Sequence, residues 1–118
     1  MTNLFFFDDA NAKPPDEVVI TELSAEPYPD DARVRVTIKI TPFQQQPNLE
    51  IYARKEDRAI VAEMSVIETM TPLLEFTLHI RGVEELAGTY LLVAELYYED
   101  RNKPQDRKEV TFEIGKTV

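Results

Sequence analysis

Apolar and polar residues alternate with a period of two in three segments of the chain. These segments are residues 33–41, 74–81 and 109–114. In the first, Val34, Val36 and Ile38 are each followed by a polar residue. A period of two places successive side chains on opposite faces of an extended strand, whereas a helix repeats every 3.6 residues. The alternation predicts three strands, each with one face in a core and the other in water.

Four further segments are less regular, but they are rich in β-branched, leucine and tyrosine residues and are bounded by turn residues. They are residues 18–24, 49–56, 59–68 and 89–98. Together the segments predict an all-β fold, a seven-stranded antiparallel β-sandwich. Residues 59–70 and 86–98 also have alanine, glutamate, leucine and methionine at spacings that fit a helix. A helical alternative therefore stays open for these two segments.

The length and the prolines indicate how the chain is organised. At roughly 150 residues per domain, the 118 residues form one domain. Pro14 and Pro15 cannot donate backbone hydrogen bonds to a helix or to a central strand. We interpret residues 1–16 as an N-terminal arm and residues 17–118 as the sandwich domain.

The arm contains a run of large apolar residues. They are Leu4, Phe5, Phe6 and Phe7. Each would contribute roughly 1.5–3 kcal/mol if fully buried, so a solvated arm would waste a large driving force. We expect the arm to dock on its own domain or on a second copy, with a flexible terminus as the alternative.

A glycine-x-tyrosine step, Gly88-Thr89-Tyr90, precedes an apolar run and follows Leu86. It resembles the start of the sixth strand in immunoglobulin-like (Ig-like) and fibronectin type III-like sandwiches, including cysteine-free bacterial ones. The resemblance implies an Ig-like β-sandwich with a tyrosine corner, in which the Tyr90 hydroxyl bonds the preceding loop and Leu86 packs on its ring. It also implies that Leu92 takes the place of the second cysteine of antibody domains and that Ile38 or a neighbour takes the place of the first.

Few residues could support catalysis. The chain has no cysteine, and its single histidine, His79, is predicted on the outer face of a strand. Ser24 and Ser65 have no Gly-x-Ser-x-Gly context, and the three glycines form no phosphate-binding loop. We therefore predict a protein that is not an enzyme and has no cofactor.

Paired acidic residues offer one possible metal site. Asp30, Asp31, Glu99 and Asp100 could hold calcium if the two loops met, since calcium prefers six to eight oxygen ligands. The spacing is not that of an EF-hand loop, and solvated acidic loops are the simpler interpretation.

The charge balance restricts the partners. Lys and Arg number 13 against 22 Asp and Glu, a net charge of −9, which disfavours nucleic acid. Arg33, Arg35 and Lys39 share one strand face, and we expect cross-strand pairing with carboxylates such as Glu75. No segment has the roughly 18–20 apolar residues of a membrane helix, and no secretory leader is evident. We expect a cytoplasmic protein without membrane contact.

The strand that contains Tyr90 also predicts a partner surface. If Tyr90 points inward, its odd-numbered neighbours point outward, beside Tyr52 of an adjacent strand. The predicted patch comprises Tyr52, Leu91, Val93 and Tyr97. An exposed apolar patch of this kind would favour a homodimer or a protein partner, with coverage by the arm as the alternative.

These features predict a non-catalytic protein-binding or assembly module, whose partner is another protein or a second copy. The alternative is a small carboxylate-based hydrolase or a carbohydrate-binding accessory domain. Paired carboxylates in a cleft would favour the alternative.

Overall fold

The computed structural model describes residues 11–29, 32–56 and 59–115, which contain a short 3₁₀ turn and seven strands. The elements are η1 (Pro15–Glu17), β1 (Ile20–Pro27), β2 (Arg33–Ile40), β3 (Asn48–Lys55), β4 (Ile60–Val66), β5 (Leu73–His79), β6 (Gly88–Tyr97) and β7 (Asp106–Ile114). Each predicted strand is present. The helical alternative is wrong for both doubtful segments, because they form β4 and β6.

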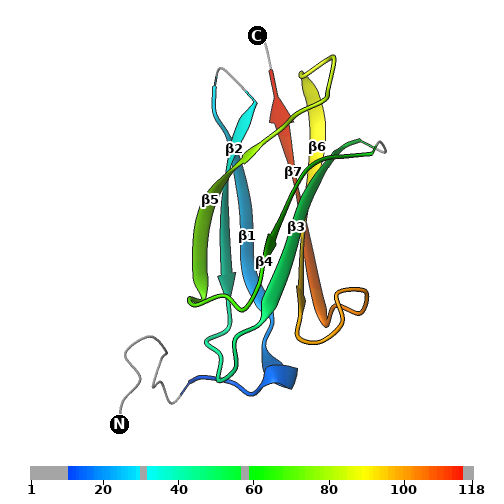
Figure 1. The fold of residues 1–118 in the computed structure, drawn as a ribbon. Helices are drawn as coiled ribbons and strands as arrows, with labels where there is room; N and C mark the ends of the chain where they lie inside the picture. The colour runs from blue at the N-terminus through cyan, green and yellow to red at the C-terminus, as the bar shows by residue number, and fades with distance from the viewer. Residues whose placement is uncertain (1–10, 30–31, 57–58, 116–118) are drawn as a thin grey trace.

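Two sheets pack face to face (Figure 1). One has the strand order β1-β2-β5 and the other the order β4-β3-β6-β7. All paired strands are antiparallel. The fold is therefore the predicted Ig-like β-sandwich. In constant-type Ig domains the fourth strand lies in the sheet of the first, second and fifth, whereas here β4 pairs with β3 in the other sheet.

Alternate residues of the two sheets meet to form the core. Val34 and Val36 of β2, Ile51 of β3 and Leu92 of β6 all have 0% exposure. Ile38 is equally buried, so apolar packing fills the region where antibody domains have a disulfide. Burial of this apolar surface is the main stabilising contribution to the fold.

The two lateral sides of the sandwich differ. On one side, the Ile20 backbone N–H donates to Asp106 Oδ2 at 2.7 Å, which joins β1 to β7. The Gln105 side-chain amide also donates to the Val18 carbonyl at 2.9 Å. On the other side, β4 and β5 are the terminal strands of different sheets (Figure 1). The β1–β7 side is thus closed by hydrogen bonds. On the other side the Arg81 N–H donates to the Val61 carbonyl at 3.2 Å near one end, and we call this side the open side.

Candidate functional site

Tyr90 forms the corner at the start of β6. Its side chain has 0% exposure, and its hydroxyl donates to the Leu86 carbonyl at 2.6 Å. Its ring stacks on Phe112, with centroids 5.2 Å apart and an interplanar angle of 9°. Burial and, to a smaller extent, the Glu85 carboxylate raise the pKa of the Tyr90 hydroxyl. These contacts hold the turn before β6 against the core. The hydroxyl bond to the preceding loop is the one that the resemblance implies, and Phe112 is the stacking partner of the ring.

Replacing Tyr90 with phenylalanine is expected to lower the free energy of unfolding by about 1 kcal/mol, because the Leu86 carbonyl loses its donor while the ring still packs. Urea denaturation measures the change. Tyr98→Phe is the comparison, since the Tyr98 hydroxyl also donates to a backbone carbonyl, that of Gln45 at 2.8 Å, but lies outside the corner. Equal losses in the two variants would contradict a special role for the corner.

The predicted patch of Tyr52, Leu91, Val93 and Tyr97 lies on the outer face of the β4-β3-β6-β7 sheet, where Tyr52 is the register partner of Val93. It is not an exposed surface. Val93 has 0% exposure and Tyr97 has 7%, while Tyr52 and Leu91 are half-buried. The prediction that these residues form an exposed apolar patch is therefore wrong.

Long polar side chains from neighbouring strands explain this burial. The Arg54 guanidinium lies 5.7 Å from the centre of the Tyr52 ring. The Tyr52 hydroxyl donates to Glu95 Oε2 at 3.4 Å, and Arg107 Nε lies 3.4 Å from the same oxygen. The pKa of the Arg107 guanidinium is raised, and the largest cause is its side-chain hydrogen bond with Tyr52. Such side chains cover apolar neighbours with their aliphatic stems while the charged groups stay in water.

A buried carboxylate lies on the same face. Glu50 has 7% exposure. It accepts hydrogen bonds from Ser65 Oγ at 2.7 Å and from Arg101 Nη2 at 3.2 Å. This face is therefore a layer of ion pairs and hydrogen bonds between strands.

The outer face of the β1-β2-β5 sheet has the predicted cross-strand charge pairs. Arg35 lies 3.7 Å from Glu75, and Lys39 lies 3.4 Å from Glu22. His79 is exposed on this face and is the register partner of Arg33.

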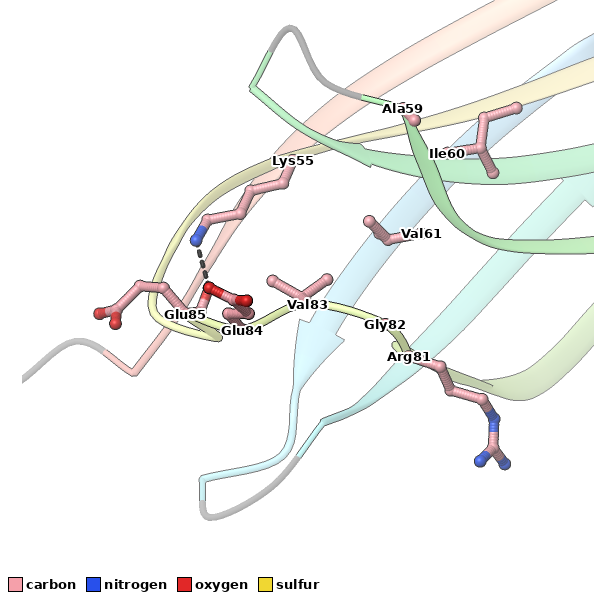
Figure 2. A pocket seen from close by; sticks show the side chains of 9 residues that line it. All are labelled: Lys55, Ala59, Ile60, Val61, Arg81, Gly82, Val83, Glu84 and Glu85. Atoms are coloured by element: carbon pink, nitrogen blue, oxygen red, sulfur yellow. Dashed lines mark hydrogen bonds between the residues drawn. The ribbon is translucent and has the colours of Figure 1, made fainter.

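A cleft of about 570 Å³ lies at one end of the open side, between β4 and the loop that precedes β6 (Figure 2). Its described lining residues are Lys55, Ala59, Ile60, Val61, Arg81, Gly82, Val83, Glu84 and Glu85. The Lys55 side chain is buried and its ammonium donates to the Glu85 carbonyl. Figure 2 shows Val61 directed toward Val83, whereas Arg81 points away. The cleft thus combines apolar walls with a lysine whose ammonium already donates to a backbone carbonyl.

The predicted calcium ligands belong to two connections that join strands at opposite ends of the sandwich. In the β1–β2 connection the Tyr28 N–H donates to the Arg33 carbonyl, and Asp30 and Asp31 are outside the described residues. Glu99 and Asp100 follow β6 at the other end (Figure 1). Within the described ranges, no three His, Cys, Asp or Glu residues are grouped so that they could hold a metal.

Leu4, Phe5, Phe6 and Phe7 of the arm lie outside the described residues. No helix within the described ranges has the length and hydropathy of a membrane span.

The open side exposes the flank of the core, which the sequence did not predict. Apolar residues of β4 and β5 pack on the core there but remain partly exposed. They are Val61, Ala62, Met64, Val66, Leu74 and Phe76. Because β4 pairs only with β3 in its sheet, one backbone edge of β4 has no strand beside it. Strand order decides this exposure, and hydrophobic alternation contains no information on strand order.

Solved structures with a similar fold are parts of much larger chains. A glycosyl hydrolase family 2 member from Bacteroides cellulosilyticus matches 81% of this chain and 15% of its own, with a TM-score of 0.55 and 15% identity. A β-glucuronidase from Bifidobacterium dentium matches 82% of this chain and 18% of its own, with a TM-score of 0.59 and 16% identity. A β-glucuronidase from Ruminococcus gnavus matches 83% of this chain and 16% of its own, with a TM-score of 0.53 and 16% identity.

This chain therefore spans less than a fifth of the length of these three proteins. At such identities the likeness shows the fold alone. No protein-family model matches the chain, and no curated protein is significantly similar to it in sequence.

Proposed function

We propose that this chain is a non-catalytic module that binds a protein partner along its open side, where an extended segment of the partner adds a strand to β4. The observation that carries the proposal is the backbone edge of β4 that has no strand beside it, next to the partly exposed flank of the core. The Arg81 N–H donates to the Val61 carbonyl at 3.2 Å, so an added strand would pair with the part of β4 that follows Val61. In strand addition, main-chain hydrogen bonds provide affinity, and pockets for alternate side chains provide specificity.

Of the terminal strands, β4 is well suited to this role. Natural proteins protect free strand edges with charges, proline or a covering segment. In β1, Glu22, Glu26 and Pro27 have this effect, and β7 contains five charged residues. β4 has seven residues, of which only Glu63 is charged. The free edge of β4 is therefore less protected than the edges of β1 and β7.

The cleft favours β4 over β5. Ile60 and Val61, the first residues of β4, line the cleft. A strand added to β4 would therefore lie beside a recess for one of its apolar side chains. Because the chain has a net charge of −9, a segment with apolar residues at alternate positions and basic flanks is the complementary partner.

A test uses selection from a phage-displayed library of random peptides, followed by calorimetry and hydrogen exchange with synthetic versions of the selected peptides. Binding is expected to protect amides of β4. Met64→Lys is expected to weaken binding by about tenfold or more, because it places a charge among apolar side chains on the open side. Thr77→Lys is the control, since Thr77 is exposed on the outer face of β5. Selected peptides that protect only other strands would contradict the proposal.

The second candidate is a carbohydrate-related accessory domain. The observation in its favour is that the similar solved structures are glycosyl hydrolases. None of the nine described residues that line the cleft is aromatic, so the cleft offers no ring for a sugar to stack on. Oligosaccharide binding that Lys55→Ala or Val83→Asp abolishes, with no peptide binding, would favour this candidate.

A further inference from the structure

Three exposed apolar side chains gather where β4 connects to β5. Ile67 is 64% exposed, Met70 is 53% exposed and Leu73 is 48% exposed. They lie beyond the end of β4, at the opposite end of this strand from the cleft (Figure 1). We call these three residues the end cluster. They account for three of the five large apolar residues that are exposed in the described part of the chain.

The N-terminal arm leaves the fold close to the end cluster. The Lys13 N–H donates to the Pro42 carbonyl at 2.8 Å, and the Gln44 N–H donates to the Lys13 carbonyl at 2.9 Å. These bonds attach residue 13 to the β2–β3 loop. The same loop reaches the end cluster, because the Gln46 side-chain amide lies 3.1 Å from Met70 Sδ and the Thr69 N–H donates to the Pro47 carbonyl at 3.0 Å.

The length of chain before this attachment is sufficient to reach the end cluster. Lys13 lies six positions after Phe7, and an extended chain covers roughly 3.3 Å per residue, or about 20 Å. Only one residue separates Gln44, which bonds Lys13, from Gln46, which contacts Met70. The tether therefore holds the apolar run of the arm near exposed apolar side chains at a high effective concentration.

We infer that the segment Leu4–Phe7 of the same chain packs on the end cluster of Ile67, Met70 and Leu73. Aromatic side chains suit this surface, because a methionine thioether makes favourable contacts with ring edges and adapts its shape. The outer face with Tyr52 and Tyr97 is a poorer surface, since polar side chains already cover it. The contact is independent of partner binding, because the end cluster lies outside β4.

The chain has no tryptophan, so a single tryptophan in the arm reports on the arm alone. Phe5→Trp and Phe6→Trp are both made in the full chain, because adjacent residues of an extended segment face opposite ways. At least one variant is expected to show the blue-shifted emission of a buried indole. Met70→Asp or Leu73→Asp in the same chain is expected to shift that emission to the red. Ile60→Asp is the matched control, because Ile60 is 46% exposed at the other end of β4.

Three results would overturn the inference. The first is a solvated emission in both tryptophan variants. The second is a blue-shifted emission that neither Met70→Asp nor Leu73→Asp changes, or that Ile60→Asp changes equally. The third is a blue shift that is lost on dilution, which would mean that the arm packs on another copy. Circular dichroism confirms in each case that the sandwich is folded.

Discussion

Replacing Val93 with aspartate is expected to lower the free energy of unfolding by about 4 kcal/mol, because the new carboxylate would be buried without a partner. Val93 has 0% exposure although it lies on an outer face. Its register partners are Tyr52 in β3 and Glu109 in β7. An aspartate there would face Glu109 and is too short to reach water, so repulsion adds to the cost of desolvation. Urea denaturation measures the loss.

Thr111→Asp is the control for this prediction. Thr111 is exposed on the same face, beside Leu91 in the register of β6 and β7. Its replacement adds the same charge in contact with water, so we expect a change within about 0.5 kcal/mol. A Val93→Asp chain that keeps its stability but changes its oligomeric state would instead indicate an exposed interface at this face.

The outer face of the β4-β3-β6-β7 sheet shows what hydrophobic alternation can and cannot predict. The alternation correctly places Tyr52 and Val93 on the face opposite Tyr90 and Leu92. It does not show what lies over them. The cover comes from side chains such as Arg54 and Glu95, whose positions depend on the pairing of β3 with β6. A residue can thus point away from the core and still be buried.

The open side shows a second limit of sequence reasoning. Met64 and Phe76 lie on strands that the apolar content predicts. Both are only partly buried, because β4 and β5 are the terminal strands of different sheets. A register shift in the β3–β4 pairing adds a further irregularity. Ala53 pairs with Ala62 but Arg54 pairs with Ile60, so Val61 has no register partner of its own and lies at the cleft. Local propensity does not determine such non-local features.

The tyrosine corner was accessible from sequence because its parts are adjacent in the chain. Leu86, Gly88 and Tyr90 lie within five residues, and the hydrogen bond joins the first to the last. The role of Lys55 was not accessible, since this residue comes from β3 and reaches Gly88 only through sheet pairing.

Replacing Gly88 with alanine is expected to lower the free energy of unfolding by about 3 kcal/mol. Gly88 has a φ of +148°, which residues with a Cβ rarely adopt, and strain of this kind costs about 1–3 kcal/mol. A Cβ there would also lie 2.7 Å from Lys55 Cε. Lys55 would have to move, and its ammonium would lose the Glu85 carbonyl in a buried position.

Gly82→Ala separates strain from crowding, because Gly82 has a φ of +72° but no atom within 4 Å of the position that a Cβ would take. Its replacement is expected to cost about 1–2 kcal/mol, the strain contribution alone. If crowding by Lys55 contributes at Gly88, the Lys55→Ala and Gly88→Ala double variant loses less stability than the sum of the two single variants, by about 1 kcal/mol. Strict additivity, or equal losses at Gly82 and Gly88, would show that Gly88 is required for its backbone conformation and not as the surface on which Lys55 lies.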